Sequence, residues 1–144
     1  MFFFLQNADD SQFLLEKFLL LIAIYGALRC DEITRLTWED VKEEKDKLQI
    51  SIQSSKTTKN KVETFFCTAS SNGGENILFY FEKYRNQFQN GTRMGRLFRR
   101  LNCKSQIREK GPIGHNTIAK IPFKIATFLK EKDPDFKKDP STYT

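Results

Sequence analysis

The chain has 144 residues, of which 39% are hydrophobic, and this is sufficient for one domain with its own core. Its three cysteines are odd in number and widely separated, which argues against a disulfide framework and favours a reducing compartment. The formal net charge is +6, but residues 1–92 hold 11 basic and 13 acidic side chains, whereas residues 93–144 hold 13 basic and 5 acidic ones. The basic part therefore predicts a surface that faces a polyanion.

The start of the chain and its apolar stretches indicate neither secretion nor membrane insertion. Residues 1–5 have no basic flank and meet the acidic residues Asp9 and Asp10 at once, unlike a secretory signal. The apolar stretch of residues 18–28 is about half the roughly 20 residues that a membrane span needs. His115 is the only histidine and the cysteines lie in distant segments, so we expect neither a metal site nor a membrane partner.

A long apolar helix is expected near the start of the chain. Asp10 or Ser11 can cap it, and its apolar residues recur at steps of three and four. These residues are Phe13, Leu14, Phe18, Leu21, Ile22, Tyr25 and Leu28. Because its middle is apolar nearly all round, we expect it to be the central core helix, with Gly26 allowing close packing. A second, short helix is expected to begin at Asp31.

Alternation of apolar and polar residues predicts a β-hairpin in the next part of the chain. Leu48, Ile50 and Ile52 alternate with polar residues, which is typical of a half-buried strand. A polar turn follows, and residues 62–67 form the expected return strand. The hairpin is therefore predicted to span residues 48–67, with lysines near its tip.

The rest of the chain alternates between helical patterns and polar breaks. In chain order we expect a helix over residues 75–88, a short basic helix over 93–101, a loop over 102–112 and a helix capped by Asn116 or Thr117. Pro122 is expected to interrupt or restart that last helix. Asp, Lys, Pro and Ser dominate residues 131–144, which are expected to form an extended or disordered tail.

An arginine box follows the core helix, and a lysine-rich turn follows the box. Residues 26–41 read Gly-Ala-Leu-Arg-Cys-Asp-Glu-Ile and continue to Leu-Thr-Trp-Glu-Asp-Val, and residues 55–61 read Ser-Lys-Thr-Thr-Lys-Asn-Lys. The first stretch resembles the first active-site box of tyrosine recombinases of the phage-integrase type, typically Gly-Leu-Arg-x-x-Glu-Leu followed by a Leu-x-Trp-x-Asp turn. The second stands where that family has a hairpin lysine. Residues 114–129 look like the eukaryotic, crypton-type branch of the family.

The resemblance implies a mainly α fold with a small antiparallel β-hairpin or sheet (α+β), an incomplete recombinase catalytic core. Residues 1–130 would form this partial core, with the arginine box at 26–41 and the lysine hairpin at 48–67, and residues 131–144 the tail. In the family a tyrosine hydroxyl attacks a DNA phosphodiester, and fixed guanidinium groups stabilise the charge that builds on its oxygens. The implied function is DNA recombination or integration in the nucleus, without a cofactor.

The resemblance also implies roles for individual side chains. Arg29 would clamp the phosphate, Lys56 would protonate the departing sugar oxygen, and Glu32 would orient Arg29. Lys59 competes with Lys56 for its role. Without the flanking pattern, Arg29 would instead be a helix-end arginine that caps carbonyls or pairs with Asp31 or Glu32. Further DNA contacts are expected from Lys59, Lys61, Arg93, Arg96, Arg99 and Arg100.

The family also needs a His-x-x-Arg box and a nucleophilic tyrosine. Ile118 stands where an arginine would have to follow His115, which is instead expected at a helix entry, and no such box precedes Tyr143. We therefore assign no nucleophile and expect a C-terminally truncated member of the family that is inactive alone. Exposed apolar surface is expected where the missing helices would pack.

DNA is the expected partner, with self-association as in the family. Two alternatives stay open. One is a non-catalytic DNA-binding module derived from a mobile element, whose affinity would fall steeply with salt. The other is a structural or adaptor protein in which the boxes around Arg29 and Lys56 are coincidental.

Overall fold

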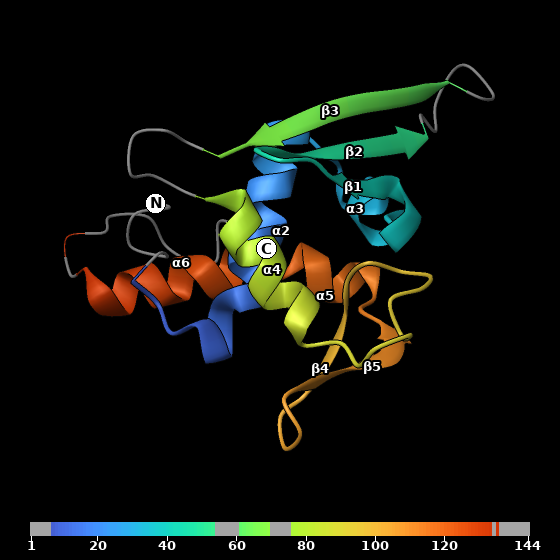
Figure 1. Ribbon diagram of the computed structural model, residues 1–144. Coiled ribbons are helices and arrows are strands. Elements are labelled where there is room, and N and C mark those ends of the chain that lie inside the picture. The colour runs from blue at the N-terminus through green and yellow to red at the C-terminus, as the bar shows by residue number, and fades with distance from the viewer. Residues whose placement is uncertain (1–6, 54–60, 70–75, 134, 136–144) are drawn as a thin grey trace.

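The computed structural model describes residues 7–53, 61–69, 76–133 and 135. They form a mixed α+β fold in which a long helix, α2 (Asp10–Gly26), runs through the middle of the molecule (Figure 1). The other helices are α3 (Cys30–Arg35), the 3₁₀ turn η1 (Trp38–Asp40), α4 (Ile77–Asn86), α5 (His115–Ala119) and α6 (Ile121–Lys132). The strands form two antiparallel sheets, β1–β2–β3 and β4–β5.

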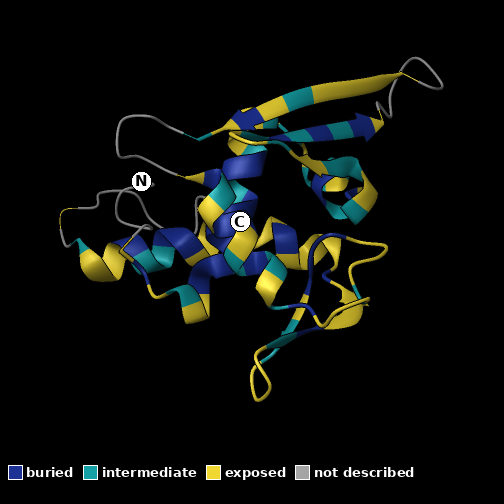
Figure 2. Ribbon diagram, in the orientation of Figure 1, coloured by how far each residue is buried: buried dark blue, intermediate teal, exposed yellow. Residues whose placement is uncertain are grey.

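The expected central helix is confirmed, and Figure 2 shows that much of its length is buried. Phe18 is fully buried and lies 5.1 Å from Tyr84 and 5.7 Å from Phe81 between ring centroids, so α2 packs closely on α4. Tyr25 was expected inside, but it is 37% exposed because the helix end leaves the core and its hydroxyl donates to the carbonyl of Thr68.

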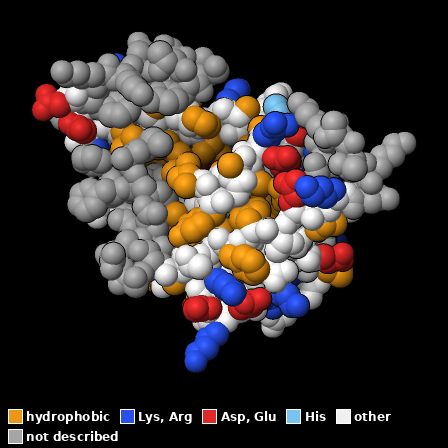
Figure 3. Space-filling model, turned by 90° about the horizontal axis from the view of Figure 1, so that it is seen from above, with side chains coloured by type: hydrophobic (Ala, Val, Ile, Leu, Met, Phe, Trp, Pro, Cys, Tyr) orange, Lys and Arg blue, Asp and Glu red, His pale blue; other side chains and the backbone are white. Residues whose placement is uncertain are grey.

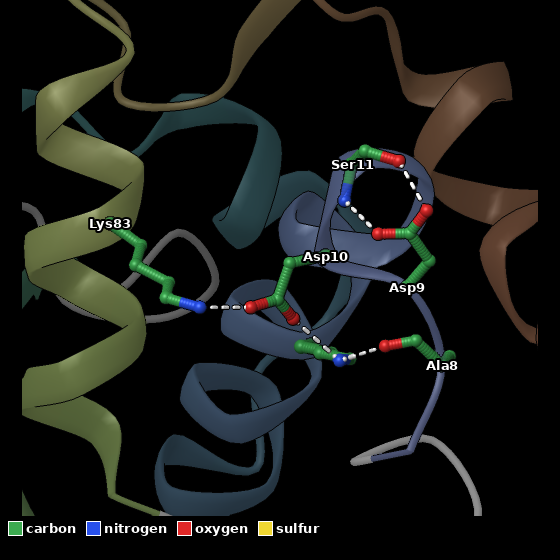
Figure 4. A network of polar contacts seen from close by, with 6 residues as sticks. Ala8, Asp9, Asp10, Ser11 and Lys83 are labelled. Atoms are coloured by element: carbon green, nitrogen blue, oxygen red, sulfur yellow. Dashed lines mark hydrogen bonds and ion pairs between the residues drawn. The ribbon is translucent and has the colours of Figure 1, made fainter.

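The first turn of α2 is held by a polar network at one end of the core (Figure 4). Asp9, not Asp10 or Ser11, is the N-cap, because its carboxylate accepts from the backbone N–H and hydroxyl of Ser11. Asp10 instead binds Lys17 at 2.6 Å and also pairs with Lys83 of α4. The network therefore ties α4 to the start of α2.

The predicted hairpin is confirmed as β2 (Lys47–Gln53) and β3 (Val62–Thr68), with Leu48 opposite Cys67 and Ile50 opposite Phe65. The apolar residues of β2 are buried and their polar neighbours are not, as the alternation predicts. A third strand, β1 (Val41–Glu43), pairs with β2 and extends the hairpin to a three-stranded sheet.

The expected basic helix over residues 93–101 and the loop over 102–112 are both wrong. Residues 99–112 instead form a two-stranded ribbon of β4 (Arg99–Asn102) and β5 (Ile107–Pro112). The backbone of the segment before β4 bonds to distant residues and not within a helical turn, since Leu97 N donates to Leu36 O and Phe98 O accepts from Ile113 N. Gly95 and Gln106, at φ +71° and +55°, make the bends before and inside the ribbon.

The predicted break between the last two helices, α5 and α6, is confirmed. Pro122 lies in the first turn of α6 and starts a new helix after α5, as expected. The N-cap of α5 is Gly114, and not Asn116 or Thr117, so His115 enters the helix as its first residue. α6 continues to Lys132, so the first residues of the expected tail are helical. None of the helices in the described ranges is long and apolar enough to cross a membrane.

Candidate functional site

Arg29 lies at a tight junction between α2 and α3. Its backbone N–H donates to the Oε2 atom of Glu32 at 2.7 Å, and Arg29 is itself the N-cap of α3. Glu32 therefore contacts the backbone of Arg29 and not its guanidinium, and its supporting role stays a prediction. Ala27, the C-cap of α2, has φ 48° and reverses the chain between the two helices.

The guanidinium of Arg29 projects into solvent. No hydrogen bond or ion pair joins it to another residue of the described ranges, so the alternative of pairing with Asp31 or Glu32 is not seen there. Asp31 turns instead to His115, whose Nε2 lies 3.2 Å from its Oδ1. The backbone of Arg29 is thus hydrogen-bonded, whereas its side chain is exposed and has no partner among the described residues.

A cleft of about 400 Å³ lies beside α3, between it, the end of β2 and the segment before β4. Its lining residues are Glu32, Arg35, Leu36, Thr37, Glu39, Asp40, Ile52, Gln53 and Arg96. The segment before β4 is fixed there because Leu97 N donates to Leu36 O at 2.8 Å and Trp38 N to Gly95 O at 3.0 Å. Arg29 does not line the cleft, although Glu32 does.

Charges of both signs meet in this cleft. The carboxylate of Asp40 is hydrogen-bonded within the cleft: its Oδ2 accepts from the backbone N–H and the hydroxyl of Thr37, both at 2.8 Å. Arg35 donates through Nε to Asp31 O, and Arg96 donates through Nη1 to Thr34 O. The two arginines stay exposed and belong to parts of the chain about sixty residues apart.

Gln53, the last residue of β2, lies at the edge of the cleft. The chain continues from there into residues 54–60, so the predicted catalytic Lys56 and its competitor Lys59 lie outside the described residues. Lys61 is described and exposed, and its Nζ is 4.0 Å from Glu63. Of the site residues expected in this part of the chain, Arg29, Glu32 and Lys61 are therefore described, and among these three Glu32 alone lines the cleft.

The predicted basic set from residue 93 onward divides into surface and buried members. Arg93, Arg96 and Arg100 are exposed. Arg99 is 5% exposed, and its guanidinium donates to the carbonyls of Arg96 and Thr92. Its prediction as a DNA contact is corrected, because those internal bonds fix the base of the ribbon and turn the charge away from solvent.

Tyrosine hydroxyls in the described ranges are engaged or buried. Tyr25 donates to a backbone carbonyl, Tyr80 is buried, and Tyr84 donates to Leu97 O and accepts from Arg99 N. Burial raises the pKa of Tyr84 to about 12. Within the same ranges no three His, Cys, Asp or Glu residues gather to hold a metal ion.

Apolar side chains are also exposed on the described part of the chain. An apolar groove of about 300 Å³ lies between α2, α3, α5 and α6 and includes Leu20, Ala23, Ile118 and Pro122. Figure 3 shows hydrophobic side chains gathered in the middle of one face, with charged side chains around them. Ile24 is 60% exposed near the end of α2.

Arg35, which lines the cleft, and Lys104 and Lys110, which are exposed on the ribbon, were not among the predicted site residues. Arg35 lies six residues after Arg29 on a predicted helix, so its presence near the box could have been noted.

Comparison of the chain with protein-family models, curated proteins and solved structures gave no match.

Proposed function

We propose that the chain carries the arginine and lysine boxes of a tyrosine-recombinase-type DNA strand-exchange protein and binds duplex DNA beside Arg29. The observation that carries the proposal is the αL backbone of Ala27. The family pattern has glycine two residues before its arginine, and Ala27 occupies that place with φ 48°, a conformation that favours glycine. The backbone at Ala27 thus has the conformation that the family's glycine would favour, although the chain has alanine there and many helices end in an αL residue.

The side-chain arrangement supports the same proposal. A planar guanidinium that is exposed, unpaired within the described residues and held at its backbone by Glu32 suits two oxygens of one phosphate. In the complete family reaction a tyrosine hydroxyl attacks the phosphodiester and the sugar oxygen leaves; there Arg29 would stabilise the charge on the non-bridging oxygens, and Lys56 would give a proton to the departing sugar oxygen. The proposed site of action is the nucleus, with self-association on DNA.

A non-catalytic DNA-binding module is the second candidate. It is favoured by the tyrosines of the described ranges, because Tyr80 and Tyr84 are buried and the Tyr25 hydroxyl is bonded to Thr68. The sequence holds no recognisable His-x-x-Arg box either. We therefore expect DNA binding by this chain without cleavage.

Fluorescence anisotropy with a labelled duplex tests the proposal. Arg29→Ala should weaken binding and reduce the slope of log K against log salt by about 0.9, because one phosphate contact is lost. Arg29→Lys should restore the slope but not the full affinity, since lysine cannot bind bidentately. The control is Lys45→Ala, which removes an exposed charge between β1 and β2.

An unchanged affinity in Arg29→Ala would favour the adaptor alternative. A denaturing gel of the same mixtures distinguishes the two DNA-based candidates, because a covalent protein–DNA adduct would demonstrate cleavage by the chain itself.

A further inference from the structure

The β4–β5 ribbon projects from the body of the molecule, away from the three-stranded sheet (Figure 1). Its strands pair with Leu101 opposite Arg108 and Asn102 opposite Ile107. The turn between them is closed by Asn102, whose Oδ1 accepts from the backbone N–H groups of Lys104 and Ser105 at 3.0 and 3.3 Å. A short antiparallel ribbon is an element that the major groove of B-DNA, about 12 Å wide, admits.

The base of this ribbon is fixed by two buried arginines. Arg108 donates through Nε to Gln87 Oε1 at 2.8 Å and through Nη1 to Arg99 O at 2.9 Å, and its backbone N–H donates to Gln87 O at 2.7 Å. Arg99 binds the carbonyls of Arg96 and Thr92. The ribbon is therefore held in one orientation before it meets a partner, which lowers the entropy cost of binding.

The solvent side of this region is strongly basic. Residues 93–112 hold seven basic side chains and one acidic side chain. Two of the seven are the buried Arg99 and Arg108, and the other five are exposed: Arg93, Arg96, Arg100, Lys104 and Lys110.

These five cations are not neutralised within the described part of the chain, where no ion pair joins any of them to a carboxylate. Other cations are neutralised, since Lys47 pairs with Glu44 and Arg85 with Glu43. A cluster of unpaired like charges repels itself, and a polyanion relieves that repulsion.

From this arrangement we infer that the β4–β5 ribbon is a duplex-DNA-binding element, with Arg100, Lys104 and Lys110 contacting the backbone while the ribbon lies in the major groove. The inference rests on the proposed DNA binding. It adds that the ribbon is a second region that contacts the DNA, besides Arg29, and that it does so in the major groove. Residues 99–112 contain no aromatic side chain, so the ribbon has no platform on which single-stranded bases could stack. The preformed shape and the missing platform favour a duplex over a single strand.

The test uses the full chain and a variant with Arg100→Ala, Lys104→Ala and Lys110→Ala together. The control is Lys42→Ala, Lys45→Ala and Lys130→Ala, which removes the same charge from exposed positions outside residues 93–112. Anisotropy is measured over a salt series with duplex DNA and with single-stranded DNA and RNA. Circular dichroism checks that both variants stay folded.

The ribbon variant should bind duplex at least about tenfold more weakly than the control and lose about 2.7 from the salt slope, because each phosphate contact contributes about 0.9. Equal binding by the ribbon variant and the control would overturn the ribbon inference and leave the proposed DNA binding in place. A wild-type chain that binds no duplex would overturn the proposed function itself. Tighter binding of a single strand that depends on the same three residues would overturn the choice of partner.

Discussion

The guanidinium of Arg108 lies over the ring of Tyr84, with its Cζ atom 4.8 Å from the ring centroid. Burial is the main influence on both groups, since it lowers the pKa of Arg108 and raises that of Tyr84 to about 12. The Tyr84 hydroxyl also donates to Leu97 O at 2.9 Å and accepts from Arg99 N at 3.2 Å. One ring therefore joins α4 to the segment that leads into the ribbon.

Tyr84→Phe should lower the free energy of unfolding by about 2 kcal/mol at neutral pH, because it leaves a buried carbonyl and a buried N–H without their partner. The folded pKa is above the unfolded one, so the hydroxyl's contribution is present below pH 10 and is lost as the pH rises toward 12. Urea unfolding at several alkaline pH values should show this loss in the wild type and less of it in Tyr84→Phe. Parallel pH curves would contradict the burial of this hydroxyl.

Ala27→Gly should stabilise the protein by about 1 kcal/mol, because an L-residue with a side chain is disfavoured at φ 48°. Ala119→Gly in α5 is the matched control and should destabilise by about 0.5–1 kcal/mol, since glycine is a poor helix former. The midpoints of urea unfolding measure both changes. Destabilisation by both substitutions would argue against the αL junction.

Gly26→Ala should destabilise the protein by about 2 kcal/mol through overpacking. A Cβ atom there would lie 2.5 Å from Cζ of Phe65, so the ring or the helix would have to move. Gly111→Ala is the control, since a Cβ at that position meets no atom within 4 Å. A thermal melt in which both variants behave alike would exclude close contact between α2 and β3.

Asp10→Asn should lower stability by about 2 kcal/mol at neutral pH, because it weakens charged hydrogen bonds to Lys17 and Lys83. Burial alone would raise the pKa of Asp10, but the hydrogen bonds from the two lysines outweigh it and lower the pKa below its ordinary value. The stabilisation is thus present above the unfolded pKa and is lost as the pH falls through the folded one. The gap between wild type and Asp10→Asn should therefore close in acid unfolding curves.

Cysteine reactivity should follow exposure. Cys103 is exposed in the ribbon turn, whereas Cys67 is fully buried and its pKa is raised by burial to about 12. Iodoacetamide followed by mass spectrometry should label Cys103 first and Cys67 only after denaturation. Labelling of Cys67 at the rate of Cys103 in the native protein would be inconsistent with the sheet register, which places Cys67 opposite Leu48.

Much of the fold follows from patterns within short stretches of the chain. The spacing of Phe18 and Ile22 and the alternation through Leu48 and Ile50 predict α2 and the β2–β3 hairpin, because which face of a local element is apolar depends on neighbouring residues alone. The contact between Glu32 and the backbone of Arg29 is also local, since it spans three residues. The αL turn at Ala27 beside it was not predicted.

The ribbon and the cleft depend on partners that are distant in sequence. Residues 93–101 are basic and contain no helix breaker apart from Gly95, so local preference predicted a helix. The backbone instead bonds to distant residues, Leu97 N to Leu36 O and Ile113 N to Phe98 O, and Leu97 and Phe98 are buried. The sequence predicts Arg99 to be a surface cation. Its guanidinium instead points inward and donates to the carbonyls of Thr92 and Arg96, because the chain bends at Gly95 and brings these carbonyls next to it. Arg35 and Arg96 line one cleft only because Leu97 binds the backbone of Leu36, a contact that no local pattern encodes.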